Sequence, residues 1–437
     1  MQRSGAEVNN ELADVNPFDP ATLQCPFPHY ARMRSEAPVL RLPRLGAVVV
    51  TTHELAVRVL RDHTTFSSGF GAVSTPVDRS AREELLAVMA EGYPRLPTLL
   101  TVDPPAHTRY RGLVAQAFHP RAVAALEPVV RRIANELIDD WDLHTPLEFV
   151  ERFAVPLPVR VIAHALNVPE ERLADFKRWS DDSVAGIGSV LSVDERLRAE
   201  RGVNEFQHYF AAELERRRSA PQDDLLTHLL NATLDEGVED GTDGVLDRRP
   251  LDTAEILSII QQLLVAGNET TTKALAEMML LLGQHRHEWE QLRNDPTRIE
   301  RVVEEVLRLA TPVQGMWRLV TVDTELAGVT LAKGTRVLVV FASADRDESL
   351  FEDPNRFDPD RFGPGRLHQR DHLAFGRGIH FCLGANLARL ELRVALEAFL
   401  RRLRSFTLTS SNEFAYFPSF LLRGLVRLEI DVVAEAP

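Results

Sequence analysis

Cysteine is scarce in this sequence. Only two cysteines, Cys25 and Cys382, occur among 437 residues, so a disulfide framework is excluded and a reducing cytoplasm is the expected compartment. Long apolar runs are missing too, because polar residues interrupt the longest stretches well before the roughly 18 residues that a membrane span requires. The N-terminus is polar and acidic where a signal peptide would be apolar, so we expect neither secretion nor a membrane anchor.

A surplus of basic residues is also absent. The chain carries 50 Lys plus Arg against 64 Asp plus Glu, a net charge of -14, which argues against nucleic acid or an anionic membrane as a partner. Hydrophobic residues make up 44% and charged residues 26%, as is typical of a globular protein. No repeat or clear linker divides the chain, so we expect one domain over residues 1–437, of which about 1–20 form a flexible N-terminal segment.

Helical periodicity covers most of the chain. Asp103 and Pro104 are suited to cap and start one helix. Asp252 and Glu255 resemble a capping box that opens a second, with Gly283 as its stop. Apolar residues lie nearly all round this second helix, so we expect it to be central and buried. Further helices are predicted at about 121–143, 156–166, 170–186, 194–219 and 223–235.

Strand signals are few. They occur at 39–51, at 318–340 and from 423 onward. A long irregular stretch rich in Gly and Pro lies at about 351–384, and loops of that length in a compact domain are usually functional. A second loop, 236–250, lies between helices rather than between domains. The pattern predicts a mainly α fold with a small β-rich region.

Cys382 stands in a loop that could bind a ligand. Gly376, Gly378 and Gly384 make the backbone pliable on both sides of the thiol, and a helix is expected directly after it. The sulfur would then lie at a helix N-terminus, which stabilises a thiolate. A buried, inert cysteine is the alternative. A zinc site with His380 is disfavoured, because no second Cys/His pair has zinc spacing.

The predicted central helix is interrupted by the segment AGNETTT, residues 266–272. Gly267 costs about 1 kcal/mol relative to Ala inside a helix, so this segment serves something other than helix stability. The Thr hydroxyls could bond back to carbonyls one turn earlier and bend the helix. Glu269 beside Thr270 could instead form a proton path. The residues alone leave both interpretations open.

Two pairs of charged residues on predicted helices can each be interpreted in two ways. Glu305 and Arg308 lie outside the apolar stripe of their helix, so periodicity alone favours a solvated pair. His107 and Arg111 lie one turn apart near a helix start, where cationic groups are disfavoured by the dipole. An external anion would explain them, and a solvated arginine face is the commoner alternative.

These elements, in this order, resemble the cytochrome P450 family of heme-thiolate monooxygenases, especially its soluble bacterial members. The segment FGRGIHFCLG is similar to the heme-binding signature of the family, AGNET to its oxygen-activating stretch and EVLR to its ExxR motif. The resemblance covers the chain from about Pro26 to the C-terminus. It implies the cytochrome P450 fold, a triangular helical prism with a minor β-rich region.

The resemblance also implies a role for each group of residues. Cys382 would be the axial thiolate ligand of heme b, and the other cofactor-binding residues would be His107, Arg111, Arg318, His380, Phe375 and Gly376. Glu269 and Thr270 would be the catalytic residues that deliver protons to bound dioxygen. Glu305, Arg308 and Arg361 would form a buried network, which overrides the periodicity. The substrate pocket would be lined by Val265, Ala266, Val313, Gln314, Met316, Ser419 and Phe420.

The implied activity is a monooxygenase reaction that hydroxylates or epoxidises a hydrophobic small molecule. Electrons would come from NAD(P)H through a separate ferredoxin, or flavodoxin, and its reductase, and the enzyme would be a cytoplasmic monomer. Arginines flanking the thiolate would attract the acidic donor, unless they are scattered solubilising charges: Arg109, Arg370, Arg377, Arg389 and Arg393. A peroxide-driven relative and a noncatalytic heme carrier are disfavoured, because Glu269 and Thr270 are both present.

Overall fold

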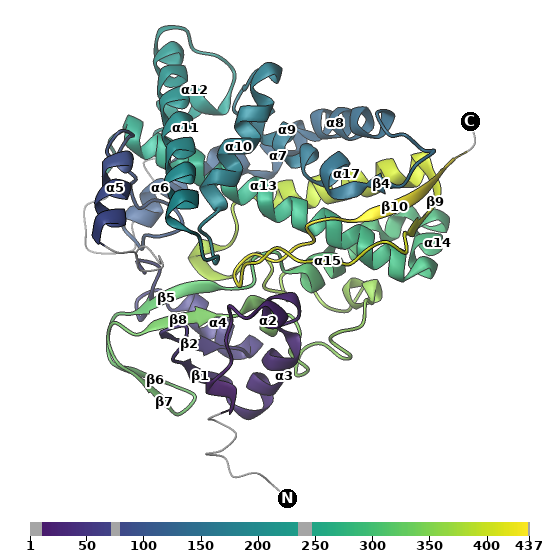
Figure 1. Cartoon of the computed structure of the whole chain (residues 1–437), viewed down its shortest axis with the longest axis horizontal. Helices are drawn as coiled ribbons and strands as arrows, with labels where there is room; N and C mark the ends of the chain where they lie inside the picture. Colours follow the sequence, from purple (N-terminus) through teal and green to yellow (C-terminus); the bar gives the residue numbers. More distant parts are fainter. Residues whose placement is uncertain (1–10, 71–78, 235–246, 436–437) are drawn as a thin grey trace, which may run out of the picture.

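The fold was obtained as a computed structural model, which describes residues 11–70, 79–234 and 247–435. A large helical part lies beside a smaller β-rich part, and the described N-terminal helices pack with the latter (Figure 1). The predicted mainly α fold with a small β-rich region is therefore confirmed. Within the described ranges, no helix is both long enough and apolar enough to cross a membrane.

The helices differ widely in length. In the N-terminal half they are α2 (Pro20–Gln24), α3 (Phe27–Glu36), α4 (His53–Arg61), α5 (Arg79–Met89), α6 (Ala106–Ala115), α7 (Pro120–Ala125), α8 (Glu127–Asp139), α9 (Pro156–Ala165), α10 (Leu173–Val184) and α11 (Val193–Ser219). They continue with α12 (Leu225–Asn231), α13 (Thr253–Gln284), α14 (Arg286–Asn294), α15 (Ile299–Ala310), α16 (Phe341–Ala344) and α17 (Ala385–Arg402).

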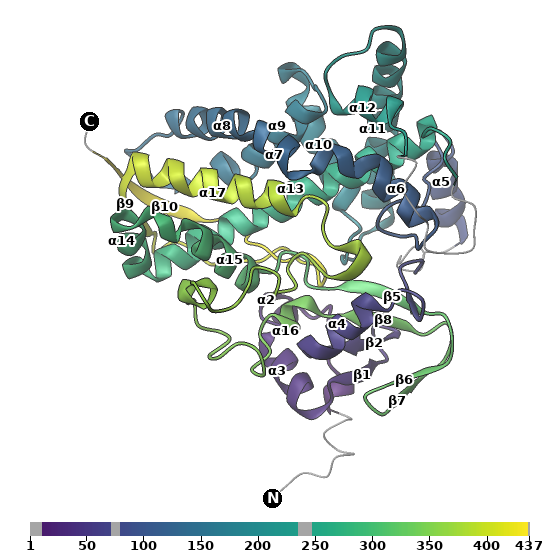
Figure 2. The same ribbon diagram turned by 180° about the vertical axis from the view of Figure 1, so that it is seen from behind.

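Helix α13 is the central helix that the sequence predicts. It crosses the helical part of the molecule, with α17 and α15 close to it (Figure 2). The capping box is present, because the Asp252 carboxylate accepts the Glu255 N–H and the Glu255 side chain accepts the Asp252 N–H. Gly283 does not end the helix, which continues through Gln284. Its buried residues lie on nearly all sides, so α13 joins the two main helical cores.

The β-structure gathers segments from both ends of the chain. One sheet has the order β1-β2-β8-β5-β3, and β2 and β8 run parallel while its other neighbours are antiparallel. A second has the order β4-β10-β9, and β6 pairs with β7. The strands are β1 (Val39–Leu42), β2 (Ala47–Val50), β3 (Phe66–Ser67), β4 (Leu147–Glu148), β5 (Met316–Val320), β6 (Thr324–Leu326), β7 (Val329–Leu331), β8 (Arg336–Val339), β9 (Leu403–Leu408) and β10 (Glu429–Ala434).

Two local predictions are wrong. Asp103 does not cap α6, which begins at Ala106, because the Asp103 carboxylate accepts hydrogen bonds from the Ser67 hydroxyl and the Ser68 N–H. The helix expected at 121–143 is divided into α7 and α8, because Leu126 is followed by a new helix start that carries a proline. Of the N-terminal segment expected at about 1–20, residues 1–10 lie outside the described residues, and Leu12 is fully buried against Met33 and the sheet.

Most of the loop predicted at 236–250 lies outside the described residues, which resume at Asp247. The irregular stretch predicted at 351–384 is present. It contains short helical turns at Pro359–Phe362 and Gly378–His380, and it leads directly to α17. This stretch brings Cys382 close to the helical core.

Candidate active site

The cysteine loop is held in a tight, defined conformation. The Cys382 N–H donates to the Phe375 carbonyl at 2.9 Å, which closes the loop on itself. Gly378 has φ +75°, and a Cβ there would lie 2.3 Å from the carbonyl oxygen of Leu60 on α4. Only glycine meets both requirements at this position. Gly376 has φ +66° and lies against Phe341.

The sulfur of Cys382 lies just before the N-terminus of α17, as the sequence predicts, although the helix begins at Ala385 and not at Leu383. Burial raises the pKa of the Cys382 thiol, and the N–H groups of Gly384 and Ala385 oppose this by hydrogen bonding to the sulfur. The backbone donors are those that a thiolate needs. A positive metal centre would complete the stabilisation of the thiolate.

Four cationic or potentially cationic side chains converge beside this loop. The rings of His107 on α6 and His380 in the loop lie 4.3 Å apart. Burial, together with the neighbouring charge of Arg111, lowers the pKa of His107 to about 4. Burial also lowers the pKa of His380 to about 3, with contributions from His107, Arg318 and Arg111. The two imidazoles are therefore neutral at pH 7.

The two arginines of this group have no carboxylate to neutralise them among the described residues. Arg318 is buried on β5 and donates to the carbonyl of its neighbour Trp317 at 2.7 Å. Burial lowers its pKa to about 10, and Asp103 opposes that shift. Burial also lowers the pKa of Arg111. One buried and one partly buried guanidinium, neither bound to a carboxylate among the described residues, form a site for an anionic ligand.

The donor set fits heme b. His380 Nε2 is buried without a hydrogen-bond partner among the described residues, and it faces His107. Together with the two arginines, these imidazoles suit the two carboxylates of a heme, and Cys382 would supply a thiolate ligand. Among the described residues, no three His, Cys, Asp or Glu side chains group as the ligands of a separate metal ion would.

The side chains in and next to the AGNET segment of α13 differ in their exposure and in their contacts. Ala266 is exposed and Val265 is partly exposed, although most of this helix is buried. The Thr270 hydroxyl donates to the Ala266 carbonyl at 2.7 Å, which is the back-bond that the sequence left open. With its hydrogen thus used, the Thr270 oxygen retains lone pairs that can accept a hydrogen bond. The Glu269 carboxylate contacts Lys273 one turn further along the helix.

The EVLR segment forms a buried ion-pair network. Glu305 and Arg308 are both 0% exposed, and their side chains form two hydrogen bonds of 2.7 Å. Arg361 donates to the Glu305 carboxylate at 3.3 Å. Arg308 also donates to the carbonyls of Asp345 and Pro354 in the loops around it. The solvated pair that periodicity favours is therefore wrong, because irregular chain covers this face of α15.

Comparison with known proteins agrees with this geometry. The family model described as Cytochrome P450 matches residues 193–423. Cytochrome P450 107B1 of Saccharopolyspora erythraea is 34% identical over 430 residues, covering 97% of this chain and 99% of that protein. The 6-deoxyerythronolide B hydroxylase of the same organism is 34% identical over 92% of this chain and 94% of its own length. The chain belongs to the cytochrome P450 family.

Solved cytochrome P450 structures share the whole fold. The structure of CYP109Q5 from Chondromyces apiculatus superposes with a TM-score of 0.82 and 36% identity, covering 98% of this chain and 100% of that one. CYP109E1 from Bacillus megaterium in complex with testosterone gives 0.76 and 34%, covering 93% and 98%. The predicted cytochrome P450 fold is therefore confirmed. This chain is a cytochrome P450 monooxygenase with heme b as its cofactor.

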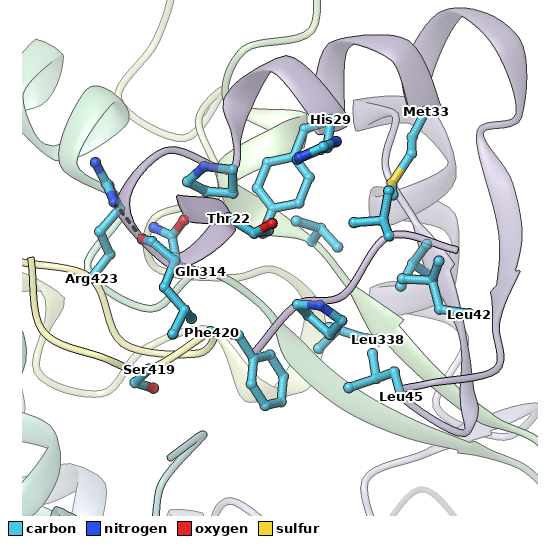
Figure 3. Close-up of a pocket in the computed structure, with 17 residues that line it drawn as sticks. Thr22, His29, Met33, Leu42, Leu45, Gln314, Leu338, Ser419, Phe420 and Arg423 are labelled. Atoms are coloured by element: carbon cyan, nitrogen blue, oxygen red, sulfur yellow. Dashed lines mark hydrogen bonds between the residues drawn. The ribbon is translucent and has the colours of Figure 1, made fainter. Parts of the chain in front are cut away.

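The predicted substrate-pocket residues of this cytochrome P450 lie in two groups. Val265 and Ala266 belong to α13, whereas Gln314, Ser419 and Phe420 line a hollow between α3, strand β8 and the C-terminal turn (Figure 3). Val313 pairs with Leu422 of that turn and Met316 begins β5, which places both near the second group. The hollow is small, with a cavity volume of about 40 Å³, and it is partly open to solvent. Its lining is mainly apolar.

The arginines predicted to attract a redox partner do not form one exposed patch. Arg109 is wrong for this role, because it is 3% exposed and paired with Glu255 at 2.8 Å. Arg389 and Arg393 are also paired with glutamates, Arg389 with Glu304 and Arg393 with residues of α8 and its own helix. Arg370 is exposed and Arg377 is partly exposed. The patch that remains is smaller and contains Arg370 and Arg377. Arg61 belongs to it as well, because its charge contributes to lowering the pKa of Arg377.

Sequence reasoning missed two charged residues close to the site. Lys273 follows Glu269 by four residues, the spacing at which helical side chains of opposite charge meet, so the sequence did carry a signal. Glu304 precedes the first residue of the EVLR motif and binds both His372 and Arg389. No periodic signal predicts this contact, because its partners lie on a loop and on another helix.

Proposed function

We propose that the predicted site residues act together in one monooxygenase site, with Cys382 as the thiolate ligand of heme. The observation that carries the proposal is a convergence of four side chains beside the cysteine loop. The buried guanidinium of Arg318 and the partly buried guanidinium of Arg111 lie there with the neutral imidazoles of His107 and His380. When bound, heme supplies the iron at which dioxygen is bound and reduced, and a thiolate ligand favours O–O cleavage.

The residues of α13 have separate tasks in this proposal. Thr270 accepts a hydrogen bond at the reacting oxygen or an adjacent water, because its own hydrogen is already donated to Ala266. Glu269 carries protons between that water and the solvent. Val265 and Ala266 provide the apolar wall beside which a C–H bond of the substrate lies.

The substrate is a hydrophobic small molecule. The mainly apolar residues of the two pocket groups support this, and the buried Gln314 carboxamide oxygen, which lacks a hydrogen-bond partner in the described part of the chain, would accept a substrate hydroxyl. Steroids and macrolactones are the first compounds to test, because one relative is a 6-deoxyerythronolide B hydroxylase and one similar structure contains testosterone. A low-to-high-spin shift of the heme Soret band reports binding directly.

The assignment of Cys382 is tested by the reduced, carbon-monoxide-bound spectrum. The wild-type protein should show the strongly red-shifted Soret band of thiolate ligation. Cys382→Ser should lose that band. A variant that kept it, or a wild-type protein that never showed it, would refute the proposed ligation.

The electron donor is a small acidic ferredoxin with an NAD(P)H-dependent reductase, and the enzyme acts as a cytoplasmic monomer. The cluster of Arg61, Arg370 and Arg377 supports this donor, because the charges of Arg61 and Arg370 both contribute to lowering the pKa of Arg377 in the cysteine loop. Arg370→Glu should slow the first electron transfer without changing substrate affinity. The wild-type rate should also fall as salt rises, because the screening length falls from about 10 Å at 0.1 M to about 3 Å at 1 M.

A further inference from the structure

A second carboxylate, beside the EVLR network, joins three elements behind the cysteine loop. Glu304 is buried on α15. One of its oxygens accepts from Arg389 Nε at 2.6 Å, and the other accepts from Arg389 Nη2 at 2.9 Å. The second oxygen also lies 2.9 Å from His372 Nε2. Glu304 thus connects α15 with α17 and with the loop that carries Cys382.

The proton of His372 is placed by its two contacts. His372 Nδ1 lies 3.2 Å from the Ala374 N–H and can only accept that hydrogen bond. The other nitrogen, Nε2, therefore carries a hydrogen and donates it to Glu304. Ala374 directly precedes Phe375, whose carbonyl accepts the Cys382 N–H. Glu304 consequently holds the loop through a chain of hydrogen bonds that ends at the cysteine.

The guanidinium of Arg389 is the positively charged group of this arrangement, and it lies close to the cysteine loop. Its guanidinium lies 4.5 Å from the ring centroid of Phe375. Although burial raises the pKa of the Cys382 thiol, Arg111 and Arg389 both oppose that rise through their charges. Arg389 is bound to a carboxylate by two hydrogen bonds, whereas Arg111 has no carboxylate partner in the described part of the chain.

We propose that Glu304 and Arg389 form a compensated charge pair that sets the electrostatic potential at the Cys382 sulfur, and through it the reduction potential of the bound heme iron. Both are positioning residues, and the inference rests on the proposed ligation by Cys382. A positive charge near the iron favours the reduced state, since reduction adds one electron there. The Arg389 charge therefore raises the potential, and the Glu304 charge lowers it.

The test is a spectroelectrochemical titration of the ferric/ferrous couple in purified holoenzyme. Glu304→Gln leaves Arg389 uncompensated, so the potential should rise. Arg389→Gln removes the cation, so the potential should fall. The double variant should return toward the wild-type value. Shifts of the same sign in both single variants, or no shift in either, would overturn the proposal, because a merely structural role gives no reason for opposite signs.

A matched control is available on the same helix. Arg393 and Glu397 are paired at 2.7 Å one turn further along α17, and both are partly exposed. Arg393→Gln and Glu397→Gln should leave the potential unchanged, because solvent screens them. A shift as large as that of the Arg389 variant would overturn the proposal.

Arg389→Lys tests the effect of the charge without a substitution at the buried Glu304 carboxylate. Lysine retains the charge but loses the two-point contact, so this variant should keep a potential nearer to the wild type than Arg389→Gln does. Equal shifts in the two variants would contradict a charge effect. The carbon-monoxide spectrum tests the underlying ligation separately. A wild-type protein without the thiolate band would refute ligation by Cys382, whereas a normal band with unchanged potentials in the variants would refute only the role of the Glu304–Arg389 pair.

Discussion

The ammonium group of Lys273 lies 2.6 Å from a carboxylate oxygen of Glu269, one turn earlier on α13. The two side chains are only 6% and 13% exposed. The lysine also lies 4.9 Å from the ring centroid of Phe417. Its stem passes Gly424, where a Cβ would come within 2.1 Å of it. The C-terminal turn is thus shaped around the lysine that holds the proposed proton-carrying acid.

Lys273→Met should destabilise the protein and alter proton delivery. The substitution leaves the Glu269 carboxylate without a partner in a mostly buried site, at a cost of about 1 to 3 kcal/mol. The free energy of unfolding in urea measures this cost, and product formed per NAD(P)H consumed measures the delivery. Arg32→Met is the control, because Arg32 and Glu36 form a more exposed pair with the same spacing along a helix and the loss of stability should be smaller. Equal losses in the free energy of unfolding in both variants would mean that the burial of Lys273 does not contribute to stability.

Thr270→Ala should bind substrate nearly as the wild type does but divert electrons to hydrogen peroxide. The reason is that oxygen is still reduced while ordered proton delivery is lost. The ratio of product to NAD(P)H consumed should fall. Thr272→Ala is the matched control, because that hydroxyl donates to the Ala154 carbonyl at 3.0 Å and should affect stability alone. An unchanged ratio in Thr270→Ala would leave this threonine a purely structural role.

Glu305→Ala should yield little heme-loaded protein. Removing one member of a buried ion pair strands the other charge at a cost of about 3 to 5 kcal/mol, and Arg308 is completely buried. Heme content per protein after purification is the measurement. Arg356→Ala removes an exposed cation from the neighbouring loop and should leave the heme content unchanged. Normal heme content in Glu305→Ala would show that the network does not hold the loop.

Glu391→Gln should stabilise the protein, and more so as the pH rises. Glu391 is buried on α17, one of its oxygens has no partner in the described structure, and burial raises its pKa from 4.5 to about 8. Because the pKa is higher in the folded state, the stability that this group contributes is present below pH 4.5 and is lost as pH rises through about 8. Glutamine stays neutral throughout that range.

The difference in Tm between Glu391→Gln and the wild type is the measurement for this effect. It should be small at pH 5 and grow toward pH 8. Glu397→Gln on the same helix is the control, because its partly exposed carboxylate is paired with arginines. A difference that did not depend on pH would contradict the burial of a protonated Glu391.

The sequence by itself determined the elements whose signals are local. The Asp252 and Glu255 capping box forms as predicted, because both partners lie within one helical turn. The glycines around Cys382 likewise specify a loop followed by a helix, since positive φ at Gly376 and Gly378 is a local requirement. Together with the resemblance that these motifs carry, such signals were sufficient to predict the fold and the family.

Only the tertiary structure decided which charges are buried. Glu305 lies off the apolar stripe of α15, and it is buried because a loop some fifty residues later in the chain covers it, with Asp358 N–H and Arg361 bound to its carboxylate. Arg109 is expected at the surface by composition, yet it is buried because Glu255 approaches from another helix. Periodicity describes one helix against an average core, whereas desolvation of a charge depends on every segment packed around it.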